Sequence, residues 1–328
     1  MRARRPLAFS LLYWALVVAL CLGVTEITVR ASGFLPVYTL QSKAIRYALR
    51  FQLDEDLLYR FLPDPQSSIN ALGFRDEKFS AKAPGTRRVI VIGDSFPTGL
   101  FVAPQETFAK ELQALLPGSE VLNLGVQGYG PDQELVTLRK FGAPLAPDAI
   151  VWSLFPANDF NDLIKNRLLR STPAGGLETV KPNAVAAELP ALRSLMLARF
   201  VATGRFLPEQ AESRLHPLLF VDSEAPQPVS EETISLFRGI ASAFRAEANN
   251  LKASLLAVVI PSREQAQAND RSSMSLNQEM ISALNASGVP FVDLSDSFLG
   301  HPELYSAEEH HFNAAGHRAA AAAIAARM

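Results

Sequence analysis

The chain contains only one cysteine and no excess of charge of either sign. That cysteine, Cys21, lies inside an apolar N-terminal run, so the remaining sequence excludes disulfides, a thiol nucleophile and cysteine-based metal sites. The 31 Lys and Arg residues are balanced by 33 Asp and Glu residues, which gives a net charge of −2. This balance argues against a basic surface for nucleic acid. An ordinary apolar core must therefore provide the stability.

The longest uncharged run, residues 6–24, lies close to the N-terminus and is rich in Leu and Val. As a helix it would be about 28 Å long, which matches the hydrocarbon core of a bilayer. Arginines precede the run and Glu26 follows it, a pattern that places the N-terminus in the cytoplasm. We therefore predict a cytoplasmic stub and a single-pass signal anchor over residues 1–24, in the inner (cytoplasmic) membrane. The rest of the chain is then expected on the periplasmic side.

A cleaved secretory signal peptide is the alternative for this run. The run is longer than a typical signal-peptide core and has no small-x-small cleavage site. Leu20 stands before Cys21, where a lipoprotein processing site would need a small residue. These features favour an uncleaved anchor.

The remaining sequence divides into a connector and a larger domain. Residues 25–86 are predicted to form a connector that packs on the domain edge and carries no chemistry; within it, residues 46–59 have the apolar spacing of a helix. In residues 87–328, short apolar runs alternate with helical patterns, as in a parallel sheet covered by helices on both faces. The predicted strands are residues 88–92, 120–124, 149–155, 254–260 and 290–294, and the predicted helices are residues 106–116, 132–141, 231–251, 276–284 and a last one from residue 314. The fold class is therefore α/β, with a five-stranded, mostly parallel sheet.

Residues 162–230 interrupt this alternation between the third and fourth predicted strands. They combine loops containing Pro and Gly with a helical stretch at residues 190–201. An insertion of this length at the active edge of a sheet is usually functional, so we predict a lid or a substrate wall. A helical extension that only covers the apolar sheet is the alternative.

The first predicted strand ends directly in the turn Gly93-Asp94-Ser95. This arrangement presents a serine hydroxyl at the carboxyl end of a buried strand, where open α/β sheets place their chemistry. Ser95 is therefore a candidate nucleophile. The alternative is a simple strand-to-helix turn, in which Asp94 and Ser95 cap nearby amides.

Two further loops follow the next two predicted strands. Three glycines fall within residues 125–130, where the backbone can approach a ligand closely, and the amide of Gly128 could donate to a developing oxyanion. The third strand ends in Asn158-Asp159, and a side-chain amide at that position suits oxyanion stabilisation. A helix N-cap is the alternative role for Asn158 and Asp159.

The C-terminal segment carries three of the five histidines, at residues 310, 311 and 317, directly before the last predicted helix. A histidine in such a loop, with a carboxylate two or three residues earlier, can accept a serine proton while the acid fixes its tautomer. Glu308 and Glu309 provide carboxylates at these spacings. A metal site is the alternative, but no helical His-x-x-x-His pair supports it.

Taken together, these four blocks resemble the GDSL/SGNH hydrolase family, in the order and on the elements that the family uses. The resemblance covers residues 87–328 without the insertion. It implies a flavodoxin-like three-layer α/β/α fold and a serine ester hydrolase. Carried over by position, Ser95 is the nucleophile and its amide an oxyanion donor, Gly128 and Asn158 supply the second and third donors, and His311 of His-Phe-Asn-x-x-Gly-His is the general base.

The chain departs from the family in the acid, because the family usually has Asp where this chain has glutamates. Glu309 fits an Asp-x-His spacing and is favoured, and Glu308 fits an Asp-x-x-His spacing. Asp293 and Asp296 are candidates from outside this segment. Of the other two histidines, His310 is expected to face solvent and His317 to cap or pack at the start of the last helix.

The sequence thus predicts a membrane-anchored, extracytoplasmic serine esterase that needs no cofactor and no metal. The resemblance makes O-acyl groups of glycans, acetyl groups above all, or lipid esters the expected substrates. One alternative is an O-acyltransferase that passes the acyl group to a sugar hydroxyl of an exported polysaccharide. The other is a non-catalytic carbohydrate-binding or assembly component that retains the fold, a reading that the missing Asp keeps open.

Overall fold

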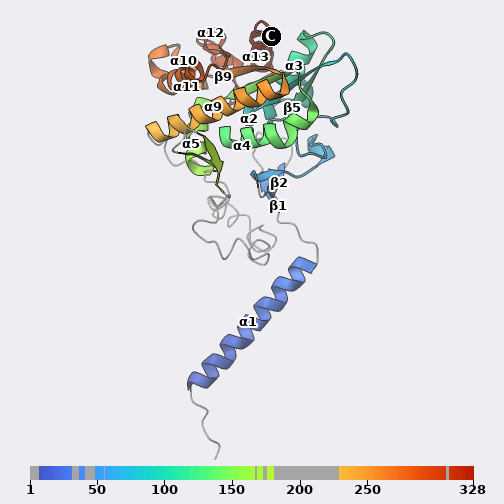
Figure 1. Cartoon of the computed structure of the whole chain (residues 1–328), viewed down its shortest axis with the longest axis vertical. Helices are drawn as coiled ribbons and strands as arrows, with labels where there is room; N and C mark the ends of the chain where they lie inside the picture. Colours follow the sequence, from blue (N-terminus) through green and yellow to red (C-terminus); the bar gives the residue numbers. More distant parts are fainter. Residues whose placement is uncertain are drawn as a thin grey trace, which may run out of the picture. The chain divides into compact units, whose positions relative to one another are not determined.

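The computed structural model describes residues 7–31, 37–40, 49–54, 56–166, 168–172, 176–180, 229–307 and 310–328 (Figure 1). The chain divides into two compact units. One comprises Met1–Tyr38 with Val185–Ser223, and the other Thr39–Ala184 with Glu224–Met328. Most of the predicted insertion, residues 181–228, lies outside the described residues.

The N-terminal apolar run forms a helix, α1 (Leu7–Ala31), in the first unit. Over Phe9–Thr28 it is long and apolar enough to cross a membrane. A signal sequence near the N-terminus would meet the same criterion.

The second unit is built on a five-stranded sheet in which all four neighbouring pairs are parallel. Its strands, in spatial order, are β10 (Phe291–Asp293), β9 (Ser254–Val259), β6 (Ala149–Leu154), β4 (Arg87–Ile92) and β5 (Ser119–Asn123). The chain leaves β4 for β5 on one side and then returns to β6 on the other side. The carboxyl end of β4 is therefore the topological switch point, where open α/β sheets bind ligands.

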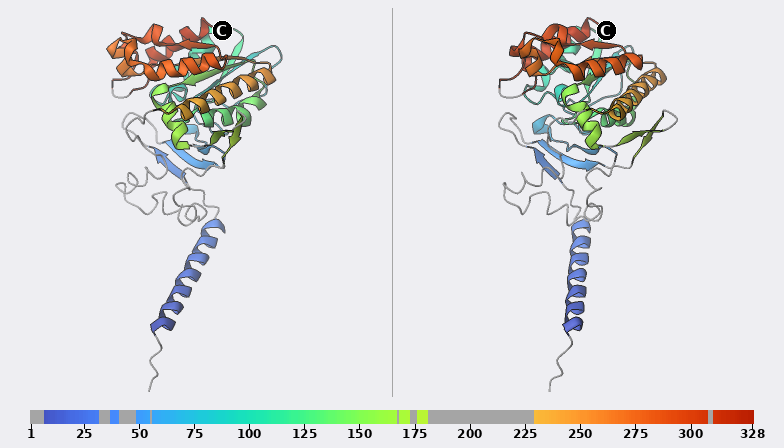
Figure 2. Two further views of the ribbon diagram at one scale, coloured as in Figure 1. Left: turned by 60° about the vertical axis from the view of Figure 1, so that its left-hand side comes forward. Right: turned by 90° about the vertical axis from the view of Figure 1, so that its left-hand side faces the viewer.

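Helices cover both faces of this sheet, which gives the predicted three-layer α/β/α fold (Figure 2). On one face α3 packs against α13, and on the other α9 packs against α4, α5 and α11. These helices are α3 (Phe108–Leu115), α4 (Pro131–Thr137), α5 (Pro156–Asn166), α9 (Glu231–Leu251), α11 (Ser275–Ala286) and α13 (Ala314–Ala325). Three short helices lie in the connections between strands and longer helices: α2 (Ser95–Thr98), α10 (Arg263–Ala268) and α12 (Ser295–Phe298). The prediction of the α/β fold is confirmed.

Strand side chains alternate between the two helical layers, as the period of a strand requires. Val89 and Val91 point into the core that α3 and α13 cover. Trp152 of β6 points to the other face, where its indole stacks on Phe244 and Phe237 of α9 at ring distances of 3.9 and 5.7 Å. Both faces are fully buried, which explains why the strands read as nearly continuous apolar runs.

The connector forms strands where the sequence predicts a helix. Strands β2 (Leu49–Asp54) and β3 (Leu58–Phe61) pair antiparallel in a small sheet of order β1-β2-β3, with β1 (Val37–Leu40) at its edge. The helix predicted for residues 46–59 is therefore wrong. Apolar residues in β2 also alternate with polar ones, the period of a strand, and the Asp54 carboxylate accepts the amides of Asp56 and Leu57 to close a tight turn. Farther along, β7 (Leu169–Ser171) and β8 (Leu177–Thr179) form a separate hairpin.

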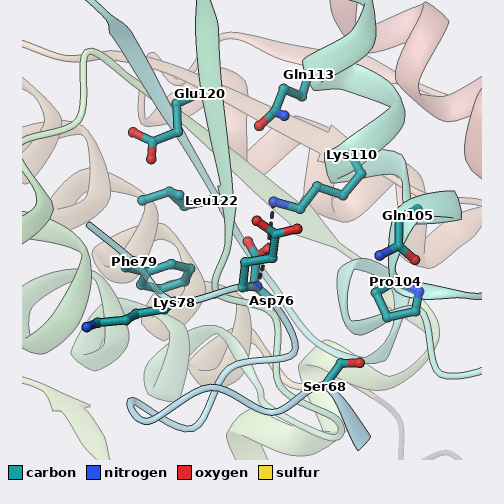
Figure 3. Close-up of a pocket in the computed structure, with 11 residues that line it drawn as sticks. Ser68, Asp76, Lys78, Phe79, Pro104, Gln105, Lys110, Gln113, Glu120 and Leu122 are labelled. Atoms are coloured by element: carbon teal, nitrogen blue, oxygen red, sulfur yellow. Dashed lines mark hydrogen bonds and ion pairs between the residues drawn. The ribbon is translucent and has the colours of Figure 1, made fainter. Parts of the chain in front are cut away.

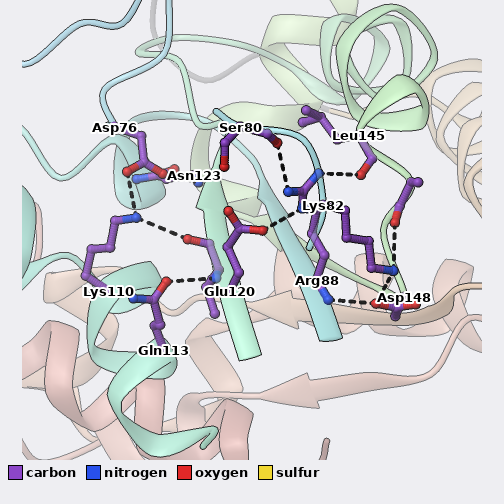
Figure 4. Close-up of polar contacts among 12 residues, drawn as sticks. Asp76, Ser80, Lys82, Arg88, Lys110, Gln113, Glu120, Asn123, Leu145 and Asp148 are labelled. Atoms are coloured by element: carbon purple, nitrogen blue, oxygen red, sulfur yellow. Dashed lines mark hydrogen bonds and ion pairs between the residues drawn. The ribbon is translucent and has the colours of Figure 1, made fainter. Parts of the chain in front are cut away.

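The connector is fastened to the sheet by a buried arginine at the start of β4. The Arg88 guanidinium donates to the Glu120 carboxylate of β5 at 2.7 Å, to the Leu145 carbonyl at 2.8 Å and to the Ser80 carbonyl of the connector at 2.9 Å (Figure 4). Only 2% of Arg88 is exposed. This end of β4 is the one opposite Ser95, so Arg88 holds the scaffold and not the site.

Candidate active site

The predicted nucleophile lies at the carboxyl end of β4, as the first residue of the short helix α2. Asp94 caps this helix, because its carboxylate accepts the amide of Phe96 at 2.9 Å. Gly93 must be glycine, since a Cβ there would lie 2.7 Å from Ser153 Cβ and 2.8 Å from Pro97 Cγ. The turn is thus packed tightly against β6, and Ser95 is 5% exposed.

The structure brings the predicted base to this serine. Nε2 of His311 lies 2.8 Å from Oγ of Ser95, across 216 positions of sequence. The residues after the histidine fix its place: Phe312 is fully buried, and Asn313 caps α13 by accepting the amides of Ala315 and Gly316. A loop between the core and a helix end therefore holds the imidazole over the nucleophile turn.

Aromatic rings enclose the imidazole of His311 on two sides. Its centroid lies 5.2 Å from the ring of Phe96 and 4.7 Å from that of Phe101. Burial, together with the nearby charge of His310, lowers the pKa of His311 to about 4. At neutral pH the ring is uncharged, and Nε2 can accept the serine proton.

The other ring nitrogen of His311, Nδ1, is buried and has no hydrogen-bond partner in the described part of the chain. Glu308 and Glu309, the predicted acids, lie outside the described residues. The two candidates from elsewhere do not reach the histidine, because Asp293 and Asp296 both form ion pairs with Arg271. Among the described residues, none therefore accepts a hydrogen bond from Nδ1 of His311.

Asp94 connects the serine to the predicted oxyanion donor on α5. One of its carboxylate oxygens lies 3.3 Å from Ser95 Oγ and accepts the side-chain amide of Asn158 at 3.2 Å. Burial raises the pKa of Asp94, and the hydrogen bonds from Phe96 and Asn158 lower it in part. Asn158 is therefore held beside Ser95 through a shared carboxylate.

The glycine loop after β5 is tied directly to the nucleophile turn. The amide of Val126 donates to the Gly93 carbonyl at 3.0 Å. At Gly125 a Cβ would lie 2.7 Å from Pro97 Cγ, so only glycine permits this approach to α2. Gly128 follows in a turn with φ of +74°, and its amide donates no hydrogen bond within the described part of the chain.

The connector, which was expected to carry no chemistry, supplies buried side chains to these loops. The Arg75 guanidinium donates to the carbonyls of Thr98, Gly99 and Val102 at 3.0, 2.6 and 2.8 Å, directly after α2. Asp76 accepts the amide of Asn123 at the end of β5 at 2.8 Å. No motif in the sequence marks these residues, because their partners are main-chain groups distant in the chain.

A surface pocket of about 630 Å³ is lined in part by Asp76, and its lining does not include the serine site. Asp76 and Lys110 form an ion pair of 2.6 Å in its wall (Figure 3). None of Ser95, Asn158 or His311 lines it. The Asp76 carboxylate is already saturated by Lys110 and by main-chain amides, so its role is structural.

The three C-terminal histidines do not converge. His310 forms an exposed pair with Glu264, with 2.7 Å between Nδ1 and the carboxylate. His317 is buried at the start of α13, where its Nδ1 accepts the amide of Phe108 at 3.1 Å, and burial lowers its pKa to about 3. The described residues contain no group of three side chains that could hold a metal ion.

Two carboxyl groups are buried near Asn158 and form no ion pair with any residue that the structure describes. Glu134 of α4 accepts the Trp152 indole N–H at 2.7 Å, and Asp159 accepts the Phe155 amide at 2.7 Å. The second oxygen of each is buried and makes no hydrogen bond to the described parts of the chain. Burial, and then the charge of nearby carboxylates, raises the pKa of both groups well above the usual range.

A parallel α/β sheet with a serine and a histidine paired at its switch point defines an α/β enzyme of the ester-hydrolase class. The chain belongs to the GDSL-like Lipase/Acylhydrolase family, which matches residues 91–319, and it is thus an ester-bond hydrolase. The resemblance to this family predicted from the sequence is confirmed.

Several solved structures are similar in fold at low sequence identity. They include the esterase EstA from Pseudoalteromonas sp., at 11% identity over 73% of this chain and 94% of that chain, with a TM-score of 0.41. The enzyme LAE5 from the metagenome of Lake Arreo matches at 16% identity over 76% and 95%, with a TM-score of 0.45. The acetylxylan esterase Axe2 from Geobacillus stearothermophilus matches at 13% identity over 73% and 93%, with a TM-score of 0.41. No curated protein gives a significant match.

The buried carboxyl group of Glu134 leads to a prediction about stability and pH. Because its folded-state pKa is raised, wild type should lose stability as the pH rises above the unfolded value of about 4.3. Glu134→Gln keeps an acceptor for the Trp152 indole but has no proton to lose. Its free energy of unfolding, measured by urea denaturation, should therefore improve relative to wild type by more than about 1 kcal/mol between pH 5 and pH 8. The exposed Glu279→Gln serves as the matched control, and an equal pH dependence for Glu134→Gln and wild type would contradict the prediction.

Proposed function

We propose that the protein is a serine ester hydrolase in which Ser95 is the nucleophile and His311 the general base. The observation that carries this proposal is the contact of 2.8 Å between Ser95 Oγ and His311 Nε2 at the switch point of the sheet. Nε2 takes the hydroxyl proton while Oγ bonds to the ester carbonyl carbon. His311 then gives that proton to the departing alcohol, and water hydrolyses the acyl-serine by the same steps in reverse order.

Three donors are proposed for the oxyanion: the amides of Ser95 and Gly128 and the side chain of Asn158. Asn158 uses one amide hydrogen on Asp94, which leaves the second hydrogen for the substrate oxygen. Within the described part of the chain, no acceptor competes with the substrate for the Gly128 amide. A well-placed donor of this kind contributes about 3–4 kcal/mol to the stabilisation of the transition state.

The proposed acid that orients His311 is Glu309, with Glu308 as the alternative. Nδ1 of His311 is buried and has no partner among the described residues, which supports the need for an acceptor there. An unpaired N–H at such a site would cost about 1–3 kcal/mol. A glutamate two residues earlier in the same loop is a suitable source for that acceptor.

The proposed setting is extracytoplasmic, with residues 1–24 as a stub and uncleaved anchor, 25–86 as the connector and 87–328 as the hydrolase domain. The length and apolar composition of α1 support the anchor. Residues 162–230 are proposed as a lid or substrate wall. The proposed substrates are O-acyl groups, such as acetyl groups of glycans, or lipid esters, and the half-buried rings of Phe101 and Phe155 offer them apolar contacts beside the site.

The nucleophile is tested by labelling the full-length protein in detergent with a fluorophosphonate. Wild type should react at Ser95, and Ser95→Ala should lose both the label and the hydrolysis of short acyl esters by more than about 1000-fold. Ser297→Ala, which removes an exposed serine on α12, is the matched control and should keep both. A labelled Ser95→Ala, or a folded wild type that does not react, would refute the proposal.

The acid is tested by the pH profile of kcat/KM, which reports the pKa of the free base. A carboxylate at Nδ1 stabilises the imidazolium, so wild type should lose activity on acidification well above pH 4. In Glu309→Gln the pH at which activity is lost should fall toward about 4, the value set by burial of His311. The rate at pH 7 should also drop by at least about 100-fold.

Glu308→Gln is the matched variant for this test and should leave the profile unchanged. If Glu308→Gln shifts the profile and Glu309→Gln does not, Glu308 is the acid. If neither variant shifts it, neither glutamate orients His311.

A further inference from the structure

The direction of the Gly128 amide is set by the turn that contains it. The amide of Tyr129 donates to the Val126 carbonyl at 3.2 Å, which closes a β-turn with Gln127 and Gly128 at its centre. Gly128 has a φ of +74°, and Gln127 is not among the residues with positive φ. This combination defines a type II turn. Type I and type II turns differ by a flip of the central peptide, so the Gln127–Gly128 peptide decides where the Gly128 N–H points.

A tyrosine of the connector holds this peptide. The hydroxyl of Tyr59, on β3, donates to the Gln127 carbonyl at 3.0 Å. It lies so close that a Cβ on Gly128 would be 2.8 Å from the Tyr59 oxygen. The carbonyl and the N–H of one peptide point in opposite directions. Fixing the Gln127 oxygen on the connector side therefore fixes the Gly128 N–H on the other side.

Two further hydrogen bonds join the backbone at β3 to this loop without touching the Tyr59 hydroxyl. The Tyr129 hydroxyl donates to the main-chain carbonyl of Tyr59 at 2.7 Å, and the Gln133 side chain donates to the Leu57 carbonyl at 2.7 Å. The rings of Tyr59 and Tyr129 meet edge to face at 5.5 Å. Burial and nearby carboxylates raise the pKa of Tyr59 well above its usual value, so the hydroxyl keeps its proton and remains a donor.

We propose that Tyr59 is a positioning residue of the hydrolase site, which acts through the Gln127–Gly128 peptide to aim the Gly128 amide at the oxyanion. The proposal rests on the proposed function, since it assumes that Gly128 is an oxyanion donor. Tyr59 lies before residues 91–319, the part that matches the family. A segment outside that part would then set the geometry of one of the three donors.

The experiment compares Tyr59→Phe with Tyr129→Phe in the full-length protein in detergent. Each variant keeps its aromatic ring and removes one hydroxyl that donates to a main-chain carbonyl where β3 meets the loop: Tyr59 to Gln127, and Tyr129 to Tyr59. The two should therefore lose similar stability in urea denaturation. Only Tyr59→Phe frees the Gln127–Gly128 peptide.

The kinetic readouts are kcat and KM for a short acyl ester and the rate of labelling by a fluorophosphonate. Tyr59→Phe should lower kcat and the labelling rate by about tenfold or more, with KM within about twofold of wild type, because the lost stabilisation belongs to the transition state. Tyr129→Phe should retain kcat within about threefold. A purely structural role would affect the two variants alike.

The proposal is overturned if Tyr59→Phe keeps its kcat while folded, or if Tyr129→Phe loses as much. Should Tyr59→Phe prove unfolded where Tyr129→Phe folds, Gly128→Ala gives the second test, since its Cβ would displace the Tyr59 hydroxyl. A folded Gly128→Ala with undiminished kcat would overturn the proposal. These failures leave wild type active and Ser95→Ala inactive, whereas an inert wild type refutes the proposed function as well.

Discussion

The rest of the structure depends on the carboxyl end of β4. Strand β6, helix α2 and the loop after β5 all meet there within van der Waals contact. Gly93 gives the closest approach, with no space for a Cβ between β6 and the start of α2. Its carbonyl accepts the Val126 amide, which brings the loop after β5 to the same point. Strand pairing therefore delivers the backbone of both loops to Ser95, and His311 has only to reach one fixed oxygen from the far end of the chain.

Burial dominates the electrostatics of the site, since no Lys or Arg among the described residues forms an ion pair with its buried carboxyl groups. Asp94, Glu134 and Asp159 are all enclosed, and burial is the largest cause of the raised pKa of each. The same dry surroundings lower the pKa of His311. A base with so low a pKa is a weak proton acceptor, so an orienting carboxylate would also tune its basicity. The proposed acid would therefore both orient His311 and raise its basicity.

Sequence patterns predicted the sheet well and the connector poorly, for a physical reason. Strands buried on both faces leave long apolar runs, so β4, β6 and β9 were found within two residues of their bounds. In β2, Phe51 is buried and Arg50 is exposed, and the short alternating pattern of this strand also fits a helix. The contact between Ser95 and His311 could be expected from the sequence because the two motifs combine special residue types with special backbone positions. The contact of Tyr59 could not be predicted, because its partner is the main-chain carbonyl of Gln127 and every residue type has such a carbonyl.

The same reasoning bears on where the functional unit begins. The family match starts at Val91, inside β4, yet the peptides around the site are held by side chains that precede it. Arg75 binds the carbonyls after α2, Asp76 binds the end of β5 and Tyr59 binds the turn before Gly128. Donors of an oxyanion site work only when they are oriented before the substrate arrives. Tyr59, Arg75 and Asp76 lie in the same compact unit as Ser95, so this part of the connector belongs to one structural unit with the nucleophile turn, and the family match begins inside that unit.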